Sequence, residues 1–308
     1  MLNISGAKTD ILKKQSNRTL ETLAKVLEIN TNDLEFKLGA ELEFYIKDDK
    51  KLTLESTKIK DITNQLMVYY KKKLRVESFE EEDGFNQFEV QFIPTNDPCL
   101  LARNIIDFRR TMHDLCEVDF RAKPNLNDAG SSLHFHISIY YKGNNLFSKE
   151  NPRDDNEYHY LPLYWSIAGM LKCMLQAMRV FAPTENCYER YLYPRKHEKN
   201  IHYPTCVCWG FNNRTCAIRI PKKPTEDPYN CRIEHRVCSS VSDPFLDLFC
   251  IFAGMNYGIA NELECPEPTF GNAFDTFHDY LIPLPKSIED ANVLFQHGMF
   301  AKLAKILK

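Results

Sequence analysis

Hydrophobic and polar residues alternate along residues 39–45, which read GAELEFY. Leu42 and Phe44 alternate there with Glu41 and Glu43, the pattern of a β-strand with one buried face. Successive side chains of a strand point to opposite faces, so the two glutamates share one face. Two carboxylates on one face repel each other unless solvent or a cation separates them. The segment alone fits either a solvated sheet face or a metal site.

The same alternation recurs in residues 87–92, 133–138 and 232–237. Each segment has an apolar side for a core and a second side with charged or hydrogen-bonding groups. The polar sides hold Gln87, Glu89 and Gln91 in the first segment, His134, His136 and Ser138 in the second, and Arg232, Glu234 and Arg236 in the third. If these faces converge, carboxylates, an imidazole and guanidinium groups meet in one site.

That set of groups favours phosphoryl transfer. Carboxylate oxygens with an imidazole suit Mg²⁺ or Mn²⁺ better than zinc, which prefers thiolates and several histidines. Guanidinium groups beside such ions suit a phosphate or carboxylate ligand, which they bind through paired hydrogen bonds. Metal ions with arginines are the usual apparatus for stabilising a transferred phosphoryl group.

Apolar residues at helical spacing predict helices between these strands. Asp97 followed by Pro98 predicts a helix start, with an N-cap and then proline at the first helical position. Helices are also predicted within 1–38, over 56–73, 164–181 and 243–262, and near Lys308. Short strands are predicted over 74–76 and 120–123. Loops are predicted over 80–83, 125–132 and 183–202, and the last of these is a candidate lid. No internal repeat or linker divides the chain, so we expect one domain over 1–308.

Composition and charge narrow the class of protein. The 308 residues are 44% hydrophobic and 26% charged, as in ordinary globular proteins, and the net charge of −3 argues against a nucleic-acid partner. No apolar run reaches the ~18 residues of a membrane span, and the N-terminus has no signal-peptide core. Eleven cysteines at irregular spacings, with no CxxC pair, favour free thiols over disulfides and therefore a cytoplasmic location.

Six motifs in a fixed order resemble those of one enzyme family. They are GAELEF, ExGxxQxE (Glu82 to Glu89), the HxH strand after a Gly/Ser loop, APTxNxYxR (Ala182 to Arg190), WxxxNRxxxIRIP (Trp209 to Pro221) and RIExR (Arg232 to Arg236). The order over about residues 39–291 is that of the catalytic domain of type I glutamine synthetase. The resemblance implies an α+β fold, in which a curved, mainly antiparallel sheet carries helices on its outer face and forms a funnel with its polar face.

The resemblance also implies a reaction. L-glutamate would attack the γ-phosphate of ATP to give γ-glutamyl phosphate, and ammonium or another amine would then displace phosphate. Two or more Mg²⁺ or Mn²⁺ ions would assist, one held by Glu43, Glu82 and Glu89 and the other by Glu41, His134 and Glu234. Glu81 is an alternative to Glu82, because the loop before Gln87 varies in length in the family.

The remaining site residues are likewise implied by the motifs. Arg190, Arg236 and the backbone of Gly130 would hold the substrate glutamate, and Arg214 would act in catalysis on both the phosphate and the glutamate. The residues along ATP would be His136, Ser138, Arg219 and Arg232. Glu198 is the candidate for the catalytic glutamate of the lid.

Departures from the family leave two alternatives open. We expect the chain to lack the family's N-terminal β-grasp domain and its C-terminal arm, so a homo-oligomer would have a non-standard size. Ala129 replaces the family's asparagine, and Cys238-Ser239 replaces its Pro-Asp. One alternative is a catalytically impaired relative that binds nucleotide and metal, and the other is a ligase for a different amine.

Overall fold

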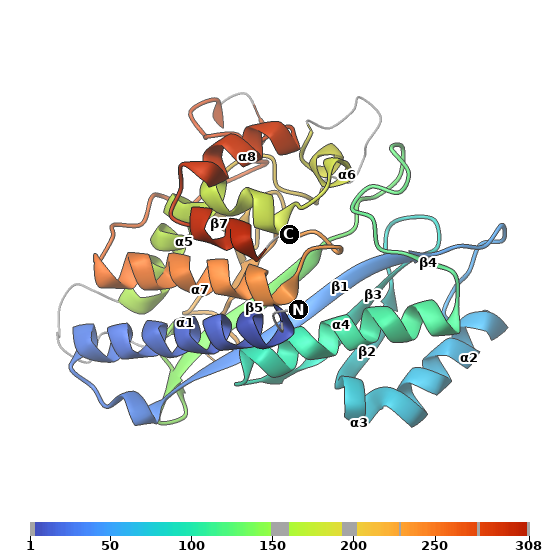
Figure 1. Ribbon diagram of the computed structural model, residues 1–308, viewed down its shortest axis with the longest axis horizontal. Coiled ribbons are helices and arrows are strands. Elements are labelled where there is room, and N and C mark those ends of the chain that lie inside the picture. The colour runs from blue at the N-terminus through green and yellow to red at the C-terminus, as the bar shows by residue number, and fades with distance from the viewer. Residues whose placement is uncertain (1–3, 149–159, 193–201, 228, 276–277, 307–308) are drawn as a thin grey trace.

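The computed structural model describes residues 4–148, 160–192, 202–227, 229–275 and 278–306 (Figure 1). Its centre is a nine-stranded sheet with the order β2-β3-β1-β5-β9-β8-β7, in which β4 pairs with β1 and β6 with β5. The pairs are antiparallel except for β7 and β8, which are parallel. The strands are β1 (Leu34–Ile46), β2 (Val76–Glu81), β3 (Gln87–Thr95), β4 (Val118–Asp119), β5 (Leu133–Tyr141), β6 (Asn144–Asn145), β7 (Trp209–Phe211), β8 (Ile218–Ile220) and β9 (Ile233–His235).

Helices cover one face of this sheet. In Figure 1, α1, α4 and α7 lie in front of β1 and β5, and α1 runs beside α7. The helices are α1 (Ile4–Leu27), α2 (Thr57–Gln65), α3 (Lys71–Leu74), α4 (Pro98–Leu115), α5 (Leu161–Phe181), α6 (Glu185–Tyr188), α7 (Pro244–Ala260) and α8 (Ile288–Gln296), with a π-helical turn over Leu66–Tyr70 and 3-10 turns over Thr31–Asp33, Glu189–Tyr191 and Ala301–Lys305. The predicted α+β class and mainly antiparallel sheet are confirmed.

Two helices begin with the same local device. The carboxylate of Asp97 accepts hydrogen bonds from the backbone N–H groups of Cys99 and Leu100 at the start of α4. Asp243 does the same at the start of α7, and a proline follows each aspartate. Each N-cap satisfies amides that have no partner within the helix, and proline loses nothing there because its missing N–H would be unpaired.

The alternating strand pattern separates the core from the polar face. Leu42 and Phe44 are fully buried, and the ring of Phe44 packs edge-on against Phe108 of α4 with 5.6 Å between centroids. Phe88 and Phe135 are buried on the same side of the neighbouring strands. The intervening polar residues therefore face away from the helices, which leaves that side of the sheet for a site.

Several local predictions were wrong. Residues 74–76 end a helix and begin β2, and Glu80 and Glu81 belong to that strand instead of a loop. The strand expected over 120–123 is the two-residue β4 just before it, and part of the predicted 183–202 loop forms α6. α8 was not predicted, because its nine residues give a short apolar stripe beside several prolines.

The cysteine prediction from composition agrees with the structure. All eleven cysteines are free thiols. No helix among the described residues is long and apolar enough to cross a membrane.

Candidate active site

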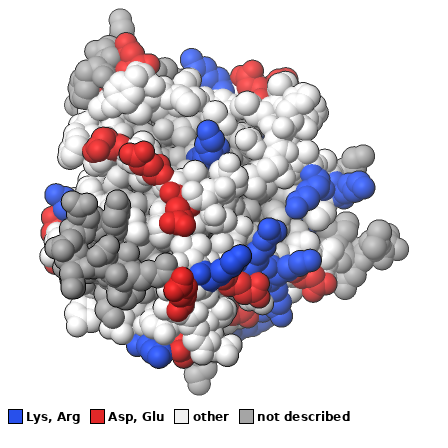
Figure 2. Space-filling view, turned by 90° about the vertical axis from the view of Figure 1, so that its left-hand side faces the viewer, with Lys and Arg blue, Asp and Glu red and all other residues white. Residues whose placement is uncertain are grey.

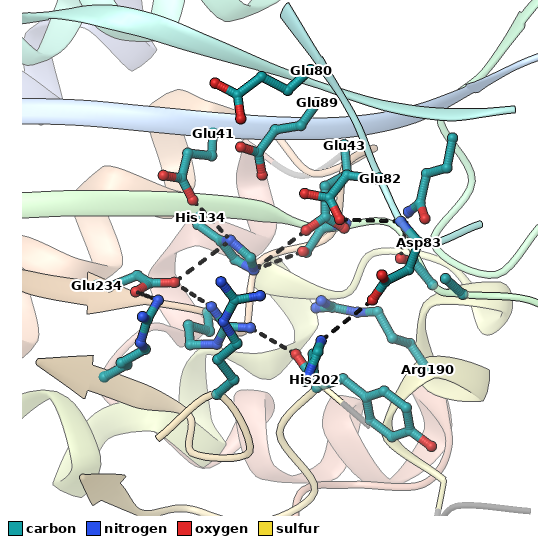
Figure 3. Close-up of a pocket in the computed structure, with 18 of the residues that line it drawn as sticks. Glu41, Glu43, Glu80, Glu82, Asp83, Glu89, His134, Arg190, His202 and Glu234 are labelled. Atoms are coloured by element: carbon teal, nitrogen blue, oxygen red, sulfur yellow. Dashed lines mark hydrogen bonds and ion pairs between the residues drawn. The ribbon is translucent and has the colours of Figure 1, made fainter. Parts of the chain in front are cut away.

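The polar face of the sheet forms one side of a cavity of about 240 Å³ (Figure 3). In Figure 3, Glu41, Glu43 and Glu89 reach toward His134 from the strands above it, whereas Arg190 and His202 lie on the opposite side. The cavity therefore has a wall rich in carboxylates facing a wall rich in guanidinium groups.

Strand register brings these side chains together from distant parts of the sequence. Glu41 of β1 is paired with His134 of β5, and Glu43 is paired with Glu89 of β3. On its other side, β5 pairs with β9, and this pairing sets Glu234 opposite His136. Cross-strand neighbours on one face lie within reach of each other, so three antiparallel pairings between strands distant in the sequence assemble the acidic wall.

His134 is the centre of this wall. Its Nδ1 atom lies 3.4 Å from a carboxylate oxygen of Glu41 and 3.8 Å from one of Glu234, and its Nε2 atom lies 3.9 Å from Glu43. Ser132 Oγ is 2.7 Å from Nε2. Burial, and then the positive charge of Arg236, lower the pKa of His134 to about 4, so the imidazole is neutral at pH 7 and free to act as a metal ligand.

The buried carboxylates are held in different charge states by their surroundings. Burial, and then the charges of Glu41, Glu43 and Glu82, raise the pKa of Glu89 to about 10. Burial also raises the pKa of Glu43, to about 7. Burial also tends to raise the pKa of Glu41. Its charge and hydrogen-bond interactions with His136 and His134 have a larger, opposite effect and hold that pKa well below its usual range.

These donor atoms fit a hard divalent cation. Ligand atoms of Glu41, Glu89 and His134 all lie within 4.8 Å of one another. Crowded carboxylates repel one another and therefore retain protons at neutral pH. A bound cation can replace those protons, because it supplies the positive charge that removes the repulsion. The sequence prediction divided the ligands differently: it placed Glu89 with Glu43 and Glu82, and Glu41 with His134.

Glu81 and Glu82 point in different directions. Glu82 lines the cavity, and burial raises the pKa of its carboxyl group. A carboxylate oxygen of Glu81 instead accepts a hydrogen bond of 2.7 Å from the backbone N–H of Leu54, outside the cavity. The geometry therefore favours Glu82 over its neighbour as a ligand.

Three arginines are anchored around the opposite wall. Arg219 Nη1 lies 2.8 Å from one oxygen of Glu234, and Arg236 pairs with the other. These charges and nearby histidines outweigh burial and lower the pKa of Glu234 to about 2. Arg190 donates a hydrogen bond of 2.6 Å to the carbonyl of Val237 and stays buried. Fixed guanidinium groups can bind a substrate carboxylate or phosphate without being ordered first.

Gly130 lies so close to Arg190 that a larger residue there would have to displace its neighbours. A Cβ atom on this glycine would lie 2.9 Å from Cγ of Arg190 and 3.0 Å from the carbonyl oxygen of Ala122. The carbonyl of Gly130 accepts a hydrogen bond of 2.9 Å from the side-chain amide of Gln87. The loop that leads into β5 is thus fixed against the arginine wall.

A second cavity, of about 230 Å³, opens beside the first and shares Glu41 and Gln91 with it. It contains three of the four residues predicted to lie along ATP, namely His136, Ser138 and Arg232. Arg232 Nε lies 3.0 Å from His136 Nδ1. The fourth predicted residue, Arg219, lines the first cavity instead.

Most of the predicted site residues thus line two adjoining cavities. Arg214 and the backbone of Gly130 also line the first cavity. Glu198 lies outside the described residues. The first cavity also contains Glu80 and Asp83 of the acidic run 80–83, together with three residues to which sequence reasoning gave no role: Lys123, His202 and Tyr203. The acidic run 80–83 is visible in the sequence, but no pattern marks the other three.

Comparison with known proteins decides the family. The family model for the glutamine synthetase catalytic domain matches residues 54–307. The chain belongs to the glutamine synthetase family. The resemblance seen in the motifs is therefore confirmed, although Glu41 and Glu43 precede the first residue of the match.

Curated relatives in this family differ in the amine that their names state. The chain is 33% identical over 197 residues to the gamma-glutamylputrescine synthetase PuuA of Escherichia coli K12, covering 61% of this chain and 38% of that protein. It is 34% identical to the type-1 glutamine synthetase 2 of Dictyostelium discoideum, over 59% and 33% of the two chains. It is 27% identical to a glutamate–isopropylamine ligase of a Pseudomonas species, over 79% and 52%. The chain thus spans from a third to about half of these glutamine synthetase relatives.

Solved structures agree on the fold. A GmaS/ADP complex superposes with a TM-score of 0.73 at 21% identity, covering 94% of this chain and 70% of that chain. A structure described as a novel glutamine synthase homolog gives a TM-score of 0.70 at 18% identity, over 97% and 67% of the two chains. At these identities the likeness to glutamine synthetase structures concerns the fold.

Proposed function

We propose that this chain is the catalytic part of an ATP-dependent ligase that joins the γ-carboxyl group of L-glutamate to an amine, with ammonium as the first candidate. The observation that supports this most strongly is the single cavity in which a carboxylate–imidazole wall faces an arginine wall. The first wall suits divalent cations and the second suits anionic substrates. The free thiols suit a reducing compartment, so we place the protein in the cytoplasm.

The reaction consists of two displacements. A γ-carboxylate oxygen of glutamate attacks the γ-phosphorus of ATP, the bond to the β–γ bridging oxygen breaks, and ADP leaves. The amine nitrogen then attacks the acyl carbon, the bond to the phosphate oxygen breaks, and phosphate leaves as the nitrogen loses a proton. Holding both substrates in one cavity lowers the barrier of each displacement by fixing the attack geometry.

The charged walls have separate roles in this scheme. Glu41, Glu89 and His134 would hold Mg²⁺ or Mn²⁺, with Glu43, Glu82 and Glu234 around them, and such ions stabilise the charge of a transferred phosphoryl group. Arg190 and Arg236 would bind the carboxylate of glutamate, and Arg214 would reach the phosphoryl group. His136, Ser138 and Arg232, which line the second cavity, would contact ATP.

A second candidate is a ligase for an alkylamine. It is favoured by relatives whose names state putrescine, ethanolamine and isopropylamine. The half-reaction with ATP and glutamate would be the same, so the two candidates differ only in the nucleophile. A chain that binds nucleotide and metal without turnover is the third outcome of the same test.

The test is release of phosphate from ATP by the full chain with Mg²⁺, L-glutamate and either ammonium, putrescine, ethanolamine or isopropylamine. We expect one amine to stimulate release and Glu234→Ala to abolish the stimulation, because the substitution removes the carboxylate with which Arg219 and Arg236 form ion pairs. Glu117→Ala is the control, since its side chain is 72% exposed and pairs with Lys47 away from the cavity. ATP binding without release under any of these conditions would contradict the ligase.

A further inference from the structure

A third cavity lies away from the two described above, where α5 begins and α7 ends. The helices cross closely there, because Gly258 of α7 packs against the backbone of Trp165 near the start of α5. The cavity is an open groove of about 860 Å³, bounded by the first turns of α5, the edge strand β7 and residues 262–268. It shares no lining residue with the first or the second cavity.

The floor of this groove is aromatic. Tyr164, Trp165, Trp209 and Phe211 all line it. Trp209 is central: its ring stands edge-on to Tyr164, with 5.9 Å between centroids, and edge-on to Phe211, with 5.1 Å. Trp165 and Trp209 are buried beneath the floor, and the half-buried Tyr164 and Phe211 offer the ring faces, which carry partial negative charge and attract cations. Lys223 already places its ammonium group 5.5 Å from the centroid of Phe211.

The rim of the groove is acidic. Glu262, Glu264 and Glu267 line it and are exposed. Within the described part of the chain, none of the three has an ion-pair partner. Figure 2 views the molecule from the end at which α7 finishes, and acidic side chains form a row across that face, apart from most of the basic ones.

The acidic segment is fixed in place by hydrogen bonds. The backbone N–H of Leu263 donates to the carbonyl of Gly258, at 3.0 Å. The indole N–H of Trp209 donates to the carbonyl of Pro266, at 2.7 Å, and the N–H of Thr269 donates to the carbonyl of Trp209, at 2.8 Å. Because Trp209 belongs to the floor, floor and rim are built as one unit.

We propose that this groove is a second binding site, separate from the carboxylate–arginine cavity, and that it binds an aliphatic diamine or polyamine. The methylene chain of such a ligand would lie on the rings, with its ammonium groups at the rim carboxylates. Glu264 and Glu267 are three residues apart, so their backbones are separated by at most ~10 Å, a span that a flexible diamine can bridge. The groove volume of about 860 Å³ falls within the ~300–1,000 Å³ of small-molecule sites, which favours a small cation over a protein surface.

Intrinsic fluorescence reports on this site directly, because the chain has two tryptophans and both line the groove. We would titrate the full chain with 1,5-diaminopentane, without ATP or glutamate, and repeat the titration with the uncharged 1,5-pentanediol. The proposal predicts a saturable fluorescence change with the diamine and none with the diol. An equal response to both compounds would overturn it. Since neither nucleotide nor turnover is involved, this result stands apart from the test of the ligase.

Three variants assign the response to the groove. Glu264→Gln combined with Glu267→Gln should weaken diamine binding at least tenfold, and Tyr164→Leu should weaken it without changing the charge. Glu21→Gln, which removes an exposed carboxylate from α1, should bind as the wild type does. Unchanged affinity in the double variant would contradict the proposal. So would a fluorescence spectrum that depends on protein concentration without ligand, together with a sedimenting dimer, since a second copy of the chain would then occupy the groove.

Discussion

Glu41 and His134 face each other across β1 and β5, with 3.4 Å between a carboxylate oxygen and Nδ1 of the imidazole. Glu41 carries a negative charge and His134 is neutral at pH 7, because burial and Arg236 lower the pKa of the imidazole to about 4. A charged oxygen ligand beside an unprotonated nitrogen ligand is the state that a divalent cation needs. The sheet register alone therefore brings together two of the donor groups that could hold such an ion.

The first prediction separates two adjacent glutamates. Glu82→Gln should weaken Mn²⁺ binding by about tenfold or more, because its carboxylate lines the cavity beside Glu43 and Glu89. Glu81→Gln should leave the affinity within about twofold, since its carboxylate contacts the backbone of Leu54 instead. Mn²⁺ titrations followed by electron paramagnetic resonance would measure both variants. Equal losses would mean that the strand end rearranges when the ion binds.

The second prediction concerns a buried acid behind the site. Asp247 of α7 is fully buried, and burial raises the pKa of its carboxyl group well above the ordinary 3.8, although Ser242 donates a hydrogen bond to it. Because the pKa is raised in the folded state, the unfolded chain releases this proton at a lower pH than the folded chain does. The carboxyl group therefore contributes stability fully below about pH 3.8, and that stability is lost as the pH rises toward the folded value.

Asp247→Asn removes this titration. We expect the variant to gain stability relative to the wild type as the pH rises from 4 to 8, with a slope of up to about 1.4 kcal/mol per pH unit. Urea denaturation at several pH values would measure the difference. Asp107→Asn is the control, because its side chain is 42% exposed on α4. A difference between variant and wild type that stays constant with pH would show that Asp247 is ionised in the folded chain.

The site could be predicted from the sequence wherever a strand alternates. The period of two places Glu41 with Glu43, and His134 with His136, on one face without knowledge of the tertiary structure. Grouping the carboxylates around particular ions could not be predicted this way, because it depends on the register between strands. That register pairs Glu43 directly with Glu89 and sets Glu41 against His134.

Residues that reach the cavity from irregular segments were missed for a related reason. Lys123 follows the two-residue β4, and His202 belongs to a segment without apolar periodicity. Only tertiary contacts place them: Lys123 donates a hydrogen bond of 2.7 Å to the carbonyl of Asp128, and the carbonyl of His202 accepts one of 2.7 Å from Arg236. Strand β2 was placed too early because its acidic residues resemble a solvated loop.

The third prediction tests the arginine wall. Gly130→Ala should raise the KM for glutamate about tenfold, since the added methyl group would lie 2.9 Å from Cγ of Arg190 and displace that side chain. The KM for ATP should change little, because three of the four predicted ATP residues line the neighbouring cavity. Steady-state kinetics would separate the two constants. Gly143→Ala is the control: its Cβ has open space, so any strain from φ +76° affects stability and not the substrate.

The last prediction concerns the close crossing of α5 and α7. A Cβ atom on Gly258 of α7 would lie 1.9 Å from the carbonyl oxygen of Trp165 in α5, and one on Gly169 would lie 2.1 Å from the carbonyl of Gly254. Backbone cannot give way as a flexible side chain does, so the helices would have to separate. Gly258→Ala should therefore lower the free energy of unfolding by about 1–3 kcal/mol or more, despite the better helix propensity of alanine.

Urea denaturation of Gly258→Ala would measure that loss, with Tyr257→Ala as the neighbouring control, since Tyr257 is 38% exposed on the same helix. The same variant should also alter the tryptophan fluorescence, because separating the helices moves Trp165 at the start of α5. A stability equal to that of the wild type would mean that the helices cross further apart than the close glycine contacts imply. A loss of stability with unchanged fluorescence would place the adjustment at Gly254 and Gly169 instead, further along the same helix pair.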